Sequence, residues 1–176
     1  ILDGFTITGS SGYDTFCIAV DAQSDVTVTN CELIGGFVGV YYYASSGEIS
    51  HNYIHDYVKN GITVNLPSSD GEAVLIIKNI VEGRGPVGLG DWAQNGIQIG
   101  WGARGVVLFN EVSDHYYTPA DWAACGILIF QSDDCVVQGN NLKENQVGIA
   151  VETWGWYGAV SASNNKIIRN TIKGGQ

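Results

Sequence analysis

The sequence predicts a single all-β domain built as a solenoid, in which one short unit of strands is repeated along the chain. Its 176 residues include 24 Gly and only 3 Pro, and no window sustains a helical period, which favours short strands joined by frequent turns. A six-residue frame with Asn at its fourth position recurs, and a Gly-Ile type of strand recurs between the copies. Such repetition indicates a fold in which neighbouring units stack on one another.

The Asn frame consists of an apolar residue, two further residues, Asn, one residue and a second apolar residue. Its clearest copies are 49–54, 76–81, 107–112, 137–142 and 167–172, which place Asn at 52, 79, 110, 140 and 170. Cys31 takes the Asn position of an earlier copy, and Phe5–Gly9 matches more loosely. Because side-chain amides that stack at equivalent bends can hydrogen-bond from one unit to the next, we expect an asparagine ladder.

The Gly-Ile strand and a polar corner complete each unit. Strands of this type begin at Cys17, Gly39, Gly61, Gly96, Gly126 and Gly148. Ser-rich corners at 23–25, 45–47, 68–70 and 131–133 follow four of them, and Ser, Asp and Gln at such places favour turns. In period-2 alternation, the residues expected to face outward from the Gly-Ile strands are Ala19, Tyr41, Thr63, Gln98, Leu128 and Ala150.

Over the range from about Phe5 to Ile172, these repeats resemble the right-handed parallel β-helix repeat proteins, also called pectin-lyase-like. The resemblance implies a right-handed parallel β-helix of about seven turns with long loop insertions, roughly 30 Å long at the usual strand spacing. It also implies a working groove over the Gly-Ile strands. Because the family includes lyases, hydrolases, epimerases, phage tailspikes and adhesins, the resemblance does not by itself assign an activity.

Charge and composition argue against several partners and leave others open. The formal charge of −10 comes without a Lys/Arg cluster, so we expect no nucleic-acid binding, and no apolar run is long enough for membrane insertion. The chain begins at Ile1 and contains no Met. We therefore expect residues 1–176 to form one β-helix domain that is a fragment or module of a larger protein. Cys17, Cys31, Cys125 and Cys135 are compatible with free thiols or with disulfides.

Aromatic residues near the expected groove are candidates for substrate binding, because flat rings stack on sugar faces. Trp92 and Trp122 lie in two long loops that share the sequence Asp-Trp-Ala, and we expect them to lie about one strand spacing apart. An alternative is that these rings only pack their own loops. The full set of candidate substrate-binding residues is Trp92, Trp122, Trp101, Trp154, Tyr41 and Gln98.

Candidate catalytic residues follow the Asn bend on successive units and are Asp56, Glu82, Arg84, Asp114 and His115. Acids, an imidazole and a cation in one row could provide general acid and base groups. The alignment expects Asp56, Glu82 and Asp114 at equivalent positions, about 5 Å apart per turn, which is comparable to carboxylate separations in glycosidases. The alternative is a solvated edge of ion pairs. The outward row of the Gly-Ile strands carries no acidic, basic or imidazole side chain, unlike pectate-lyase-like and polygalacturonase-like members.

The sequence therefore predicts an extracellular or cell-surface module that processes or binds a polysaccharide or oligosaccharide. If it is catalytic, it would be a glycoside hydrolase, a polysaccharide lyase or an epimerase. The alternative is a non-catalytic structural or adhesive solenoid segment, with end-to-end self-association through uncapped ends. No cofactor is expected, apart from Ca²⁺ if Asp25, Asp70, Asp133 and Asp134 converge at the Ser corners. His51, His55 and His115 do not form a metal motif.

Overall fold

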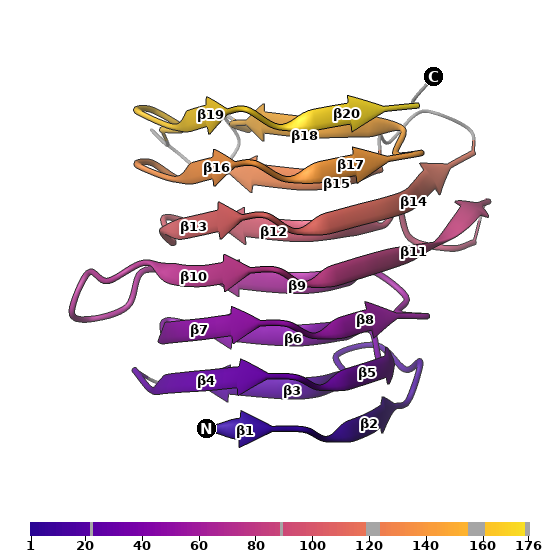
Figure 1. Ribbon diagram of the computed structural model, residues 1–176, viewed down its shortest axis with the longest axis horizontal. Coiled ribbons are helices and arrows are strands. Elements are labelled where there is room, and N and C mark those ends of the chain that lie inside the picture. The colour runs from indigo at the N-terminus through magenta and orange to yellow at the C-terminus, as the bar shows by residue number, and fades with distance from the viewer. Residues whose placement is uncertain (22, 89, 119–123, 155–160, 175–176) are drawn as a thin grey trace.

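The computed structural model describes residues 1–21, 23–88, 90–118, 124–154 and 161–174. Within these residues the chain forms three sheets in which all the strands are parallel. Each strand pairs with the strand three places along the chain, so successive turns stack into a rod (Figure 1). The all-β, right-handed parallel β-helix predicted from the repeats is confirmed. No helix in the described part of the chain is long and apolar enough to cross a membrane.

Each turn contributes one strand to each sheet in a fixed order. Sheet A contains β1 (Leu2–Asp3), β4 (Asp25–Thr29), β7 (Ser46–Ser50), β10 (Val74–Ile77), β13 (Gly105–Leu108), β16 (Val136–Gln138) and β19 (Lys166–Ile168). Sheet B contains β2 (Thr6–Gly9), β5 (Glu32–Gly35), β8 (Tyr53–His55), β11 (Ile80–Val87), β14 (Glu111–Tyr117), β17 (Asn141–Lys143) and β20 (Thr171–Lys173). Sheet C contains β3 (Phe16–Asp21), β6 (Val38–Tyr43), β9 (Asn60–Asn65), β12 (Asn95–Gly100), β15 (Cys125–Phe130) and β18 (Val147–Glu152).

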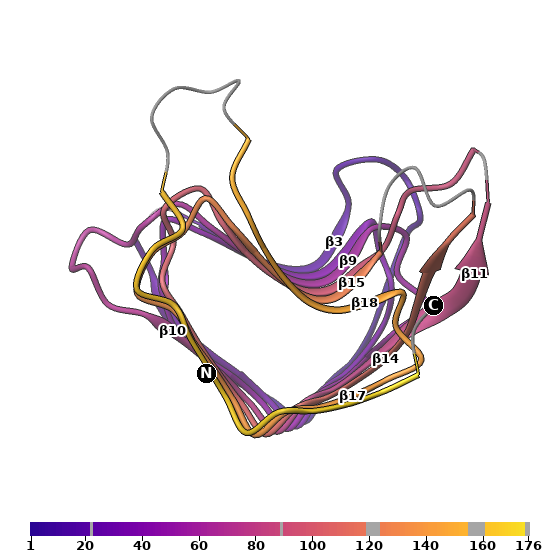
Figure 2. The same cartoon turned by 90° about the horizontal axis from the view of Figure 1, so that it is seen from above.

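The core consists of columns of identical or similar side chains inside the rod. Ile62, Ile97 and Ile127 are paired across β9, β12 and β15, and each has 0% exposure. Parallel register places the same face of each strand inward, and the apolar column is therefore continuous along the axis. In the view along the axis, the three sheets enclose this core, and sheet C curves inward between the other two (Figure 2). Loops stand on both sides of its outer face (Figure 2).

The predicted asparagine ladder forms the bend between sheets A and B. Asn110 is representative: its Oδ1 accepts hydrogen bonds from the backbone N–H and Nδ2 of Asn79, at 2.9 and 3.0 Å. Its Nδ2 donates to Ile76 O and to Asn140 Oδ1. The residue before each ladder position has a positive φ, including Lys78 at 55° and Phe109 at 54°. The bend therefore leaves buried polar groups that the ladder satisfies, and Asn52, Asn79, Asn110, Asn140 and Asn170 are structural residues.

The repeated Gly of the Gly-Ile strands is required by close packing. A Cβ atom built on Gly61 would lie 2.4 Å from Val81 Cγ1 and 2.8 Å from the carbonyl oxygen of Gly96. Equivalent contacts occur at Gly96 with Val112 and at Gly126 with Leu142. Sheet B side chains thus fill the space that a side chain on these residues would occupy, and the same contact repeats from turn to turn.

We expect Asn110→Ala to destabilise the fold by about 2–4 kcal/mol, because it leaves the buried N–H of Asn79 without its acceptor. Urea unfolding followed by far-UV circular dichroism measures this change. Asn141→Ala is the matched control, since Asn141 is a half-buried amide next to the ladder but outside it. Equal losses in the two variants would contradict a structural role specific to the ladder.

Candidate functional site

The outer face of sheet C forms the floor of the candidate site. The strand register places Ala19, Tyr41, Thr63, Gln98, Leu128 and Ala150 in one row, as the alignment predicted. The character of this floor changes along the axis. It is aromatic on β3 and β6, where Phe16 stacks on Tyr41 with ring centroids 4.9 Å apart. It carries amides on β9 and β12, and an apolar cluster of Cys125, Leu128 and Phe130 on β15.

Aromatic clusters stand at both edges of this floor. Trp92 packs against Phe37 and Tyr13 at the corner between sheets B and C, with centroid distances of 5.5 and 6.0 Å. At the corner between sheets C and A, Phe130 contacts both Trp101 and Trp154, at 5.0 and 5.3 Å. We call these the entry cluster and the exit cluster, in chain order.

The rings of both clusters remain accessible. Trp92 is 47% exposed, and Trp101 and Trp154 are each 37% exposed. Their packing in the loops therefore leaves ring surface available for a ligand, so the two interpretations of these residues are compatible. The predicted partner of Trp92, Trp122, lies outside the described residues.

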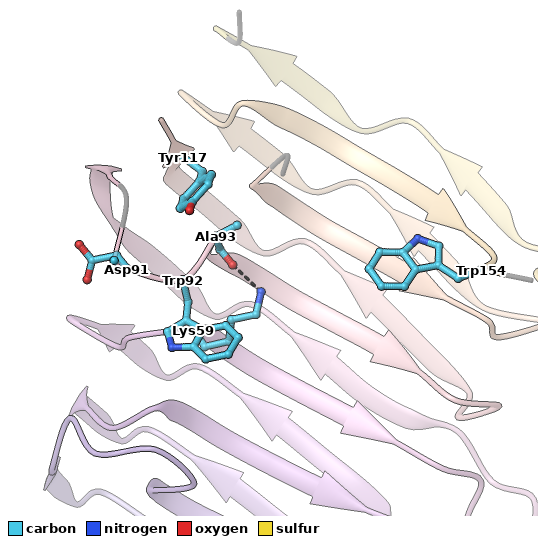
Figure 3. A pocket seen from close by; sticks show the side chains of 7 residues that line it. Lys59, Asp91, Trp92, Ala93, Tyr117 and Trp154 are labelled. Atoms are coloured by element: carbon cyan, nitrogen blue, oxygen red, sulfur yellow. Dashed lines mark hydrogen bonds between the residues drawn. The ribbon is translucent and has the colours of Figure 1, made fainter. Parts of the chain in front are cut away.

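A pocket of about 610 Å³ lies between the two clusters (Figure 3). Trp92 and Trp154 stand on opposite sides of it, and Lys59 reaches in from the position just before β9. Among the described residues, its lining comprises Lys59, Gly90, Asp91, Trp92, Ala93, Tyr117 and Trp154. Pockets of this size accommodate small organic ligands.

Lys59 is held against the loop that carries Trp92. Its Nζ donates a hydrogen bond to the carbonyl oxygen of Ala93. Burial lowers the pKa of the Lys59 ammonium group to about 8, because desolvation disfavours the charged form. The same loop is anchored by Gln94, which is fully buried. Gln94 accepts a hydrogen bond from the Arg84 backbone N–H at 2.9 Å and donates to Tyr57 O at 2.6 Å.

The predicted catalytic residues on sheet B are not aligned as expected. Glu82 pairs in register with His55 and Ser113, so Asp56 and Asp114 each lie one residue beyond the expected position. The expected alignment of these three residues at equivalent positions is therefore wrong. Asp56 and Asp114 both have a positive φ, and the register of β11 and β14 shifts at this point. A bulge of this kind changes the direction in which side chains point, and the Asn frame carries no signal for it.

Most of these charged residues have partners on the surface. Asp56 Oδ2 lies 2.8 Å from His55 Nδ1, and Glu82 accepts a hydrogen bond from Tyr53 OH at 2.7 Å. Arg84 forms an ion pair with Asp91 at 3.5 Å. Only this last pair reaches the pocket, through Asp91. The assignment of Asp56, Glu82, Arg84, Asp114 and His115 as catalytic residues stays a prediction.

His115 is a core residue rather than part of an exposed edge, because it has 0% exposure. Its Nδ1 lies 2.6 Å from Asn145 Oδ1, and its Nε2 is bonded to the hydroxyl of Tyr57. Asn145 Nδ2 donates to Val112 O at 2.9 Å. The Asn145 oxygen therefore faces the ring, so His115 carries its proton on Nδ1 and Tyr57 donates to Nε2. Burial lowers the pKa of His115 to about 4.

The Ser corners and cysteines have structural roles. Ser24, Ser45 and Ser132 each donate to a nearby backbone carbonyl oxygen. Asp70 Oδ1 accepts a hydrogen bond from the backbone N–H of Glu72 at 3.0 Å. The four cysteines all lie in the described ranges, and no disulfide joins them there. No group of three or more His, Cys, Asp or Glu side chains in the same ranges could hold a metal ion.

Several site residues were missed in the sequence. Lys59, Asp91 and Tyr117 line the pocket, while Tyr13 and Phe37 complete the entry cluster. All of these residues except Tyr117, the last residue of β14, come from corner loops. The lengths of these loops differ between turns, so the repeat does not align them. Their positions in the sequence could have identified them as candidates. Each lies a few residues before a Gly-Ile strand or at the end of a strand of sheet B.

Comparison of the sequence with known proteins identifies the family of this chain. A family model described as a right handed beta helix region matches residues 2–176. Neither the curated proteins nor the solved structures include a match to the chain.

We expect the stability of the protein to fall as the pH decreases from 6.5 towards 4, partly because of His115. The unfolded chain binds a proton on this residue near pH 6.5, whereas the folded chain resists it until about pH 4. The contribution is complete above pH 6.5 and decreases by about 1–2 kcal/mol by pH 5. Urea unfolding at pH 7.5 and pH 5 measures the free energy of unfolding at each pH. We expect the difference between the two values to be smaller in His115→Gln than in the parent protein. His51→Gln is the control, because His51 is exposed. If the difference between the two pH values were the same in His115→Gln as in the parent protein, His115 would not be the source of the pH dependence.

Proposed function

The chain belongs to the right-handed β-helix family, and we propose that it is an extracellular module that binds a neutral polysaccharide on the outer face of sheet C. The proposal depends on one observation above all. Trp92 of the entry cluster and Trp154 of the exit cluster, both partly exposed, stand on opposite sides of a pocket of about 610 Å³, and the outer face of sheet C carries further rings and amides. Sugar rings present apolar faces and polar edges, and this arrangement offers a partner for each.

The charges around the floor favour an uncharged glycan. The row from Ala19 to Ala150 contains no ionisable group apart from the hydroxyl of Tyr41. Asp21 and Glu152 lie at the two ends of the neighbouring row, and the whole chain carries a formal charge of −10. A polyanionic chain in this groove would meet like charges, and Lys59 is the one basic side chain among the described residues that line the pocket.

Binding is better supported than cleavage by the position of the ionisable groups. General acid and base catalysis needs a donor and an acceptor within reach of one bond of the substrate. Of the predicted catalytic residues, His115 is enclosed in the core, and Asp56 and Glu82 are bonded to neighbours on sheet B. Of the described residues that line the pocket, the two charged ones, Lys59 and Asp91, are bonded to Ala93 and Arg84 respectively.

We expect neutral oligosaccharides to change the tryptophan fluorescence of the protein, and Trp92→Ala or Trp154→Ala to weaken their binding about tenfold each. Each substitution removes a ring on one side of the pocket. Phe109→Ala is the matched control, because Phe109 is 50% exposed at the bend between sheets A and B. A panel of neutral and acidic polysaccharides, scored for both binding and new reducing ends, provides the measurement. Cleavage abolished by Asp114→Asn would replace the binding proposal with an enzymatic one.

Calorimetric titration at pH 8 tests the charge of the ligand through Lys59. Near its pKa of about 8, the Lys59 amine takes up protons if an anionic group binds beside it. We expect neutral ligands to show no proton uptake when the titration is repeated in buffers of different ionisation enthalpy. Tighter binding of acidic glycans, with uptake that disappears in Lys59→Met, would contradict the proposed ligand class.

A further inference from the structure

The middle of the groove floor contains a relay of three amides and one backbone group. Cys125 N–H donates to Asn95 Oδ1 at 3.1 Å. Asn95 Nδ2 in turn donates to Gln98 Oε1 at 3.4 Å, and Asn60 Nδ2 donates to the same oxygen at 3.3 Å. Asn60 and Asn95 are each only 4% exposed. Because Asn95 is withdrawn from water, reversing its amide would leave the N–H of Cys125 without an acceptor.

The orientation of the relay follows from its first member. A backbone N–H can only donate, so the side of Asn95 that faces Cys125 must be its oxygen. Asn95 therefore directs its NH₂ group at Gln98, and the oxygen of Gln98 must face Asn95. The usual ambiguity between oxygen and nitrogen in a side-chain amide is thus removed by the bonding itself.

The nitrogen of Gln98 is left for a ligand. No residue in the described part of the chain accepts a hydrogen bond from Gln98 Nε2, and the side chain is half-buried in the central row of the floor. On either side of it in that row lie Thr63 and Leu128. A fixed N–H donor at this position can donate a hydrogen bond to an acceptor oxygen of a ligand. A hydroxyl or ring oxygen of a sugar that lies between the entry and exit clusters is such an acceptor.

We propose that Asn95 is a positioning residue that holds Gln98 as a hydrogen-bond donor, and that Gln98 selects glycans with an acceptor oxygen at the centre of the groove. This inference rests on the proposed glycan-binding function. Asn95 acts on the ligand only through Gln98, since its own oxygen is engaged by Cys125 N–H and its nitrogen by Gln98.

Asn95→Asp is the informative substitution. A carboxylate still accepts the hydrogen bond from Cys125 N–H, but it offers Gln98 an acceptor in place of a donor. Gln98 should then turn its nitrogen towards the introduced carboxylate and its oxygen towards the ligand. We expect about tenfold weaker binding of a neutral oligosaccharide, measured by tryptophan fluorescence. In a Gln98→Ala background, the same substitution should have no further effect. Asn65→Asp is the control for an added charge on the same sheet, at the end of β9.

The outcomes separate this inference from the proposed function. Equal losses for Asn95→Asp in the presence and absence of Gln98 would overturn the relay while leaving glycan binding intact. If no oligosaccharide binds at all, the proposed function fails, and the relay is tested by hydrogen exchange of the side-chain amides in solution NMR. We expect fast exchange for the Gln98 NH₂ group in the parent protein and slower exchange in Asn95→Asp. Slow exchange in both proteins would refute the fixed orientation.

Discussion

The asparagine ladder is the interaction on which the rest of the structure depends. A left-handed residue turns the chain sharply between sheets A and B, which leaves backbone polar groups inside the bend. The ladder satisfies these groups from one turn to the next, for example through Asn79 N–H and Asn110 Oδ1. Since each amide both donates and accepts along the axis, the ladder also aligns the turns. Parallel register in all three sheets follows from that alignment, and with it the continuous apolar core.

A rod stabilised from within leaves its outer faces free for other roles. The core columns and the close contacts of Gly61 and Gly96 occupy the inward positions of sheet C. The outward positions can then vary without loss of the fold, and they change from aromatic to amide to apolar along the axis. The corner loops contribute the tryptophan rings of the site, because they place Trp92 and Trp154 at the two edges of the floor.

Burial separates two kinds of polar residue in this protein. His115, Tyr57 and Asn145 form a closed network in which every bonding group points at another group of the protein. Asn60, Asn95 and Gln98 form an open network, whose last nitrogen has no acceptor in the described chain. Closed networks contribute to the specificity of the fold, whereas an open network at an outer face is a candidate for ligand recognition.

The sequence by itself determined the repeated elements: the fold, the ladder and the row of outward residues from Ala19 to Ala150. Periodicity carries that information, since each turn meets the same environment and therefore repeats the same residues. Only the tertiary structure decided the site. The register of β11 and β14 shifts between Glu82 and Gly85, opposite Asp114, and His115 beyond it lies in the core. Loops of unequal length brought Lys59, Asp91 and Trp154 to one pocket. Insertions break the period, so their contacts depend on three-dimensional packing that no repeat in the sequence records.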